Sequence, residues 1–184
     1  ILVSSEITAV VLTYNEEEQI RGLLRNLGWC YDTILVDGGS TDKTRTIARE
    51  QGTTIIDEPD DGKGSISFDH HRARGVEAAE TDWILSIDAD ERIPDALRQE
   101  LICHLAQEEP EQIVEAPRAN YLDEKRLRGS GQWPDYQPIL FTQDAITFSK
   151  APHAFANYRT NRVRQLPADT NLAIQHQFAD SVLD

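Results

Sequence analysis

The first part of the chain alternates short apolar runs with stretches typical of helices. Four runs are rich in Val, Ile and Leu and have the length of buried strands, at 7–12, 33–36, 53–56 and 83–87. Helices are predicted between and after them, at 20–27, about 43–51, 68–79 and from 94 to about 107. Strands that alternate with helices predict a parallel sheet whose ligand crevice lies at the carboxyl ends of the strands.

After Pro110 the pattern changes to short strands without intervening helices. Ile113-Val114 and Ile139-Leu140-Phe141 are predicted strands. Ile146-Thr147-Phe148 is predicted to pair with the strand before it, in a hairpin that turns at Gln143-Asp144. We therefore expect one α/β domain with two halves, residues 1–110 and 111–184.

Polar residues follow several of the apolar runs. Tyr14, Asp37, Asp57 and Asp88 each stand at the carboxyl end of a predicted strand, and Asp90 follows two residues after Asp88. Two close carboxylates repel each other, and a hard divalent cation removes that cost. A solvated strand end followed by a helix cap is the alternative interpretation, and a lone Asp-x-Asp pair is a weak signal.

Charge and composition restrict the partners of the protein. The 184 residues include 18 Lys and Arg against 32 Asp and Glu, a net charge of −14. This balance disfavours nucleic acid and anionic lipid as bulk partners. No apolar run is long enough to span a bilayer. We expect a cytoplasmic location, with room for a peripheral contact at the inner face of the membrane.

Three ordered segments resemble glycosyltransferases of family 2, which have the GT-A fold. They are Ala9–Glu17, with the sequence AVVLTYNEE, Ile34–Thr44, with ILVDGGSTDKT, and Trp83–Glu91, with WILSIDADE. The form DADE, with Trp133–Gln137 and Leu140-Phe141 later, resembles the subgroup of bacterial lipopolysaccharide-core glucosyltransferases. This resemblance implies a three-layer α/β/α sandwich with a mostly parallel central sheet.

The resemblance also implies roles for individual residues. Contacts to the nucleotide-sugar would come from Thr13, Tyr14, Asn15, Glu16, Asp37, Gly39, Arg72, Asp88, Ala89 and Asp90. Mn²⁺ or Mg²⁺ would be bound by Asp88 and Asp90, with His153 or His176 as a further ligand of the metal or phosphate; we include His153 in the predicted set. A structural role remains the alternative for each histidine. Asn15 with Glu18 also matches a capping box, so Asn15 has a structural alternative too.

An inverting transfer needs a base for the acceptor hydroxyl, and Asp135 is the predicted one. It follows Trp133-Pro134, where the family places groups on the acceptor side. The alternative is that Asp135 only starts a turn after Pro134. Basic residues in Lys125–Arg128 form either a solvated loop or a contact to an anionic ligand, and the sequence does not separate the two.

Three departures from the family pattern bear on function. Gly38 stands where many members have a second Asp, and Ala73 stands where Asn is frequent. The subgroup usually continues beyond the point that matches His176, whereas this chain stops at Asp184. The chain also starts at Ile1 and has no methionine, so we expect residues before it and a missing C-terminal part.

The predicted function is metal-dependent transfer of a sugar, with inversion, from a nucleotide-sugar that we expect to be UDP-linked. The expected acceptor is a glycan or a lipid-linked molecule. Two alternatives remain: a sugar nucleotidyltransferase, and a non-catalytic module that binds nucleotide-sugars. The acidic stretch Thr13–Glu18 disfavours the first, and intact Asp88 and Asp90 disfavour the second.

Overall fold

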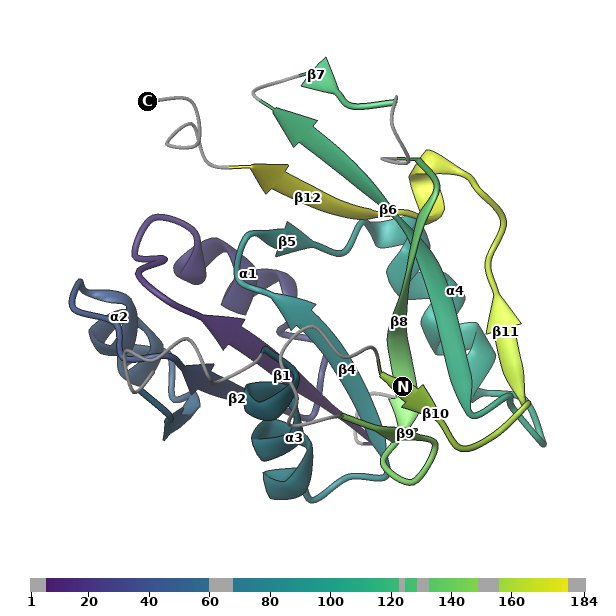
Figure 1. Cartoon of the computed structure of the whole chain (residues 1–184), viewed down its shortest axis with the longest axis horizontal. Coiled ribbons are helices and arrows are strands. Elements are labelled where there is room, and N and C mark those ends of the chain that lie inside the picture. Colours follow the sequence, from purple (N-terminus) through teal and green to yellow (C-terminus); the bar gives the residue numbers. More distant parts are fainter. Residues whose placement is uncertain (1–5, 60–67, 123–124, 129–132, 149–155, 179–184) are drawn as a thin grey trace.

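A mixed β-sheet forms the centre of the molecule (Figure 1). The computed structural model describes residues 6–59, 68–122, 125–128, 133–148 and 156–178. Within them, the strand order of the main sheet is β3-β2-β1-β4-β8-β6-β12-β5, with β7 and β11 also paired to β6. The bounds of its strands are β1 Ile7–Thr13, β2 Asp32–Asp37, β3 Thr54–Asp57, β4 Trp83–Asp88, β5 Glu91–Arg92, β6 Ile113–Leu122, β7 Lys125–Arg126, β8 Asp135–Thr142, β11 Val163–Gln165 and β12 Ile174–Phe178.

The first half of the sheet agrees with the sequence pattern. Strand β1 pairs in parallel with β2 on one side and β4 on the other, and β3 continues the parallel order beside β2. The helices that connect or follow these strands are α1 Ile20–Asn26, α2 Thr44–Glu50, α3 Phe68–Ala78 and α4 Asp95–Leu105. The predicted strands and helices of this half are therefore confirmed, and the carboxyl ends of four parallel strands lie at one edge.

The second half of the sheet is mixed, so the mostly parallel order holds only for the first half. Strand β8 is antiparallel to both β4 and β6, whereas β12 runs parallel to β6 and antiparallel to β5. The predicted hairpin across Gln143-Asp144 is wrong. Strand β9, Ile146–Thr147, pairs instead with β10, Asn157–Tyr158, in a separate two-stranded sheet. The α/β class is correct.

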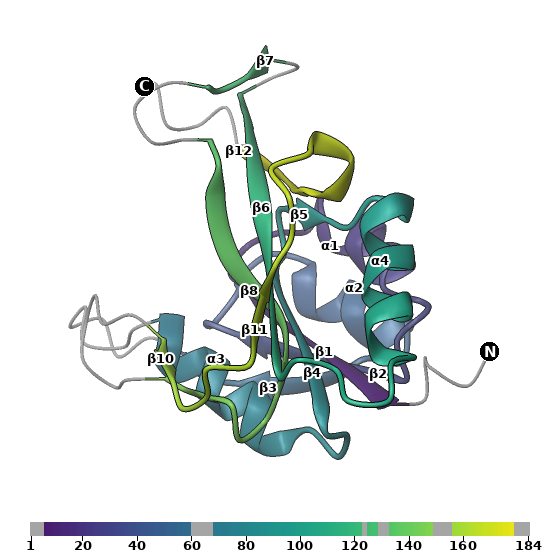
Figure 2. The same ribbon diagram turned by 90° about the vertical axis from the view of Figure 1, so that its right-hand side faces the viewer.

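Alternating side chains of β1 divide the core into two faces. Ile7, Ala9 and Val11 pack in the cluster that includes residues of α1, α2 and α4, whereas Val10 packs in the cluster that includes Val76 of α3. Figure 2 shows α1, α2 and α4 on one side of the sheet and α3 on the other. The sheet between these two groups of helices forms the predicted three-layer α/β/α sandwich. In the described part of the chain, no helix has both the length and the apolar character needed to cross a bilayer.

Gly75 lets the backbone of helix α3 pack directly against strand side chains of the sheet. A Cβ atom at this position would lie 2.3 Å from Cγ1 of Val10 and 3.0 Å from Cγ2 of Val36. Only glycine allows this approach. The close packing brings Asp69 and Arg72, near the start of α3, to the cavity at the carboxyl end of β4.

Candidate functional site

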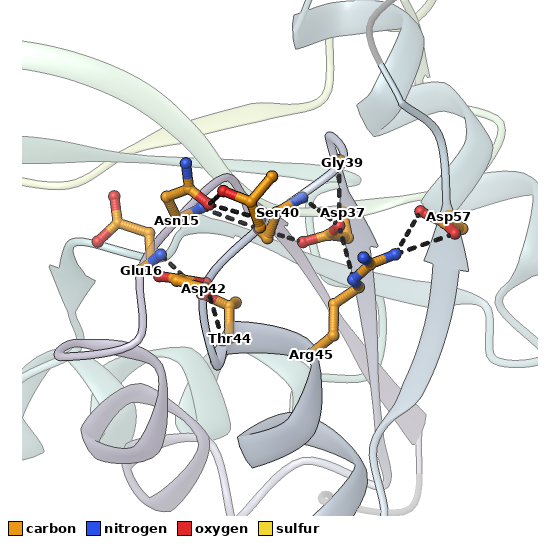
Figure 3. A network of polar contacts seen from close by, with 10 residues as sticks. Asn15, Glu16, Asp37, Gly39, Ser40, Asp42, Thr44, Arg45 and Asp57 are labelled. Carbon is orange, nitrogen blue, oxygen red and sulfur yellow. Dashed lines mark hydrogen bonds and ion pairs between the residues drawn. The ribbon is translucent and has the colours of Figure 1, made fainter.

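Two loops at the carboxyl edge of the sheet are joined by hydrogen bonds (Figure 3). The backbone N–H of Asn15 donates to Ser40 Oγ at 2.9 Å, and Asn15 Oδ1 accepts from the backbone N–H of Thr41 at 2.8 Å. The next backbone N–H, of Glu16, donates to Thr44 Oγ1 at 2.8 Å. The capping-box prediction for Asn15 is therefore wrong, because α1 starts five residues later at Ile20 and has no side-chain cap. Asn15 ties the loop after β1 to the loop after β2.

The buried carboxylate of Asp37 holds the loop after β2 by accepting hydrogen bonds from it. Its Oδ2 accepts the backbone N–H groups of Gly39 and Ser40, and its Oδ1 accepts the Ser40 hydroxyl at 2.5 Å. Arg45 Nε lies 3.7 Å from the same carboxylate, whose side chain is 0% exposed. Asp37 therefore has no exposed atom for the predicted nucleoside contact. Gly39 has φ of +95°, so its place in this turn has a conformational reason.

The other two residues at the end of β1 differ in exposure. Tyr14 is 60% exposed and offers an aromatic face to solvent, as stacking on a nucleobase requires. Thr13 is buried, and its Oγ1 has no hydrogen-bond partner among the described residues. A Cβ on Gly38 would lie 3.7 Å from Cδ2 of Tyr14, so a side chain here would contact the tyrosine ring.

At the end of β4, Asp88 forms an ion pair with α3. Arg72 Nη2 donates to Asp88 Oδ1 at 2.7 Å, and Arg72 also lies 3.9 Å from Asp69. Arg72 Nε is buried without a hydrogen-bond partner in the described part of the protein. Such a donor is costly unless a ligand accepts from it, which fits the predicted phosphate contact. Ala89 is buried, and its N–H donates to Leu12 O, so it fixes the turn between Asp88 and Asp90.

Asp90 pairs with a histidine from the last described strand. Its Oδ2 lies 3.1 Å from Nε2 of His176, on β12. His176 Nδ1 donates to Asn120 Oδ1 at 2.7 Å, since an amide oxygen can only accept. This contact holds the ring so that Nε2 faces the carboxylate of Asp90. An imidazole nitrogen and a carboxylate oxygen are both groups that can bind a divalent cation.

The described residues fit a metal ion that is coordinated partly by the protein and partly by a bound nucleotide diphosphate. They contain no group of three or more His, Cys, Asp or Glu side chains placed to hold a metal by themselves. One carboxylate oxygen and one imidazole nitrogen suit Mn²⁺, which then needs further oxygens such as those of a diphosphate. The other predicted metal ligand, Asp88, forms its ion pair with Arg72. His153 lies outside the described residues.

Negative charge accumulates around the turn after β4. Burial raises the pKa of Glu16, and the carboxylates of Asp90 and Asp42 raise it further. Burial and then the Asp88 carboxylate raise the pKa of Glu91 to about 7, against opposing contributions that include Arg118. Both pKa shifts arise because burial and neighbouring carboxylates disfavour the charged form of each side chain. A divalent cation nearby would favour the charged forms.

Asp135 lies at the start of β8 and lines a cavity of about 430 Å³. Arg118 of β6 donates to its Oδ2 from Nε at 2.9 Å, and Arg118 Nη2 lies 2.7 Å from the same oxygen. Gln137 Nε2 donates to Oδ1 at 2.9 Å. Arg72 and Asp88 line the same cavity, so three predicted site residues from both halves meet there.

Three charged residues of this cavity are absent from the predicted site. They are Asp69 of α3, Glu91, which is 4% exposed, and Arg118, whose Nη1 lies 3.3 Å from Glu91 Oε1. Glu91 follows Asp90 directly, and an acid abutting a buried strand was a usable signal. Arg118 lies in the stretch EAPRANYL of β6, where nothing in the sequence marks it. Its partners are 17 and 27 residues away in sequence.

The family model described as "Glycosyl transferase family 2" matches residues 8–168. The chain belongs to this family. An uncharacterized glycosyltransferase of Mycobacterium bovis is 37% identical over 84 residues, which are 46% of this chain and 36% of that protein. A 4,4'-diaponeurosporenoate glycosyltransferase of Staphylococcus aureus is 35% identical over 88 residues, covering 46% of this chain and 24% of that protein. The family 2 chain thus matches about a quarter to a third of these curated relatives.

Solved structures support the same fold. Staphylococcus aureus TarS, residues 1–349 in complex with UDP-GlcNAc, has a TM-score of 0.65 and 16% identity, covering 95% of this chain and 59% of that one. Glucosyl-3-phosphoglycerate synthase of Mycobacterium tuberculosis, with Mn²⁺, UDP and phosphoglyceric acid, has a TM-score of 0.53 and 18% identity, covering 76% and 56%. At these identities the likeness concerns the GT-A fold alone.

Proposed function

We propose that this family 2 chain transfers a sugar from a UDP-sugar to a glycan or lipid-linked acceptor with inversion, and needs a divalent cation. One observation carries the proposal: Asp135 lines the same cavity as Asp88, and Asp90, two residues after Asp88, faces His176. A donor site and a candidate base therefore meet across one space. The structures of TarS with UDP-GlcNAc and of the synthase with Mn²⁺ and UDP support the choice of donor.

In this proposal the chain's residues bind, orient and accept a proton. Asp90 and His176 would hold the cation, which would supply positive charge to stabilise the diphosphate leaving group. Tyr14 stacks on the base, and Arg72 Nε donates to a phosphate oxygen. Asp135 takes the proton of the acceptor hydroxyl while that oxygen bonds to the anomeric carbon, and the bond from this carbon to the diphosphate breaks with its electron pair going to UDP.

Release of UDP from a panel of UDP-sugars tests the proposal without a known acceptor, because water can serve as acceptor. We expect release with Mn²⁺ and none above background with EDTA. Asp135→Asn keeps the shape of the side chain and should lower release about a hundredfold, the usual scale of general-base catalysis. UDP affinity should stay unchanged in this variant. Release by the variant at the wild-type rate would place the base elsewhere.

The same assay separates the alternatives. A non-catalytic module would bind UDP-sugars and release no UDP from them. A sugar nucleotidyltransferase would release pyrophosphate from a nucleoside triphosphate and a sugar phosphate. The loop after β1 presents Glu16 and Glu17 rather than a basic glycine-rich segment, which disfavours the second alternative.

A further inference from the structure

The turn that carries Asp90 and the candidate base Asp135 are joined by a continuous set of hydrogen bonds. The backbone N–H of Asp88 donates to Glu91 Oε2 at 2.9 Å. Glu91 Oε1 accepts from Arg118 Nη1 at 3.3 Å, and the other two nitrogens of that guanidinium contact Asp135 Oδ2. Two side chains therefore span the distance between the donor edge of the sheet and the acceptor side.

The side chains in this set are buried or partly buried. The side chain of Glu91 is 5% exposed, that of Arg118 is 24% exposed and that of Asp135 is 28% exposed. The elements involved are the short strand β5, the middle of β6 and the start of β8. The planar guanidinium of Arg118 can hold Glu91 and Asp135 in fixed directions at the same time, because its N–H groups form a rigid fork.

We propose that Glu91 and Arg118 are positioning residues, which set the location and orientation of the Asp135 carboxylate relative to the turn at Asp88–Asp90. The inference rests on the proposed function. Arg118 occupies Oδ2 with two nitrogens, whereas Oδ1 accepts, among the described residues, only from the neutral amide of Gln137. Oδ1 is thus the oxygen that takes the proton of the acceptor hydroxyl. In this proposal Arg118, which also lines the cavity, acts through Asp135.

A double-mutant cycle tests this role with UDP release into water, measured at pH 8 with Mn²⁺ and the UDP-sugar that wild-type protein hydrolyses fastest. Arg118→Lys keeps the charge but replaces the planar fork, which holds two carboxylates in fixed directions, by a flexible point charge. We expect it to lower turnover about tenfold or more and to leave UDP affinity and KM within about threefold. In the Asp135→Asn background the same change should alter turnover less than twofold, because residues that act as a unit are not additive.

Two further variants serve as a matched control and as a substitute for Arg118→Lys. Arg164→Lys is the matched control, since Arg164 also contacts two side chains, Glu100 and His104, but lies away from the cavity; it should retain wild-type turnover. Glu91→Gln keeps the packing and replaces Arg118→Lys if that variant does not fold. It too should lower turnover in the wild-type background and have less than a twofold effect in the Asp135→Asn background. Additive losses in the cycle, or a tenfold change in UDP affinity, would overturn the positioning role. If wild-type protein releases no UDP from any UDP-sugar, the proposed function fails, and this inference with it.

Discussion

Replacing Gly75 by alanine should destabilise the protein, although alanine is the better helix former. Alanine in place of glycine inside a helix contributes about 1 kcal/mol of stability. Here, however, the added Cβ would lie 2.3 Å from Cγ1 of Val10 and 3.0 Å from Cγ2 of Val36, and both valines are fully buried. Overpacking of this kind costs about 1–3 kcal/mol. The obstacle is two branched strand residues, so we expect the upper end and a net loss of about 2 kcal/mol.

Urea denaturation measures this loss, and two variants serve as controls. Gly22→Ala places the same change in α1, where the nearest atom is the flexible end of Arg92 at 3.1 Å, so stability should stay equal or rise. Val10→Ala in the Gly75→Ala background removes the obstructing methyl groups, and the two losses should be less than additive. The reasoning is refuted if Gly75→Ala is as stable as Gly22→Ala. Because α3 carries Arg72, Gly75→Ala should also weaken UDP binding.

Three other predictions concern the metal, the loop and pH. Asp90→Ala should abolish the difference in UDP affinity between Mn²⁺ and EDTA seen by calorimetry, with an unchanged melting temperature in the apo protein; a retained Mn²⁺ effect would exclude Asp90 as a ligand. Asp37→Ala should lower the free energy of unfolding by about 2–4 kcal/mol, since buried donors of Gly39 and Ser40 lose their acceptor; a neutral effect in urea denaturation would contradict this. Burial lowers the pKa of His104 and Arg164 lowers it further, so the unfolded chain takes up a proton more readily than the folded one. Stability should therefore be complete at pH 8 and decline as pH falls below about 6.5 toward the lowered pKa, and His104→Gln should remove this part of the decline between pH 7.5 and 5.5; parallel urea midpoints of the two proteins over that range would refute it.

The sequence predicts the first half of the fold well because its signals are local. Continuous apolar runs mark β1, β2 and β4, and each is buried in the structure. The second half is harder to predict because its pairings are distant and its strands are short or polar. Strand β12 has the sequence IQHQF and pairs with β5, while β11 and β10 have only three and two residues. Nothing local indicates these partners.

The candidate site divides in the same way. Asp88, Asp90, Tyr14 and Arg72 follow from strand ends and from the resemblance. The resemblance offers His153 and His176 as candidate ligands but does not show which one faces Asp90, because that contact joins residues 86 apart through the pairing of β12 with β5. The buried role of Asp37 also could not be predicted, since a carboxylate that supports a turn and one that binds a ligand look alike in a sequence.

The pairing of β12 with β5 has a consequence for synthesis on the ribosome. The parallel strands and the turn at Asp90 emerge first, and His176 follows 86 residues later. At a translation rate of about 5–20 residues per second, this interval lasts about 4–17 s. During that time the nascent chain displays its clustered acids without the imidazole, and the edge of β6 that β12 later covers stays open. The proposed cation site thus matures only after His176 has emerged, so a chain stalled before that point would expose an unpaired strand edge before it could bind metal there.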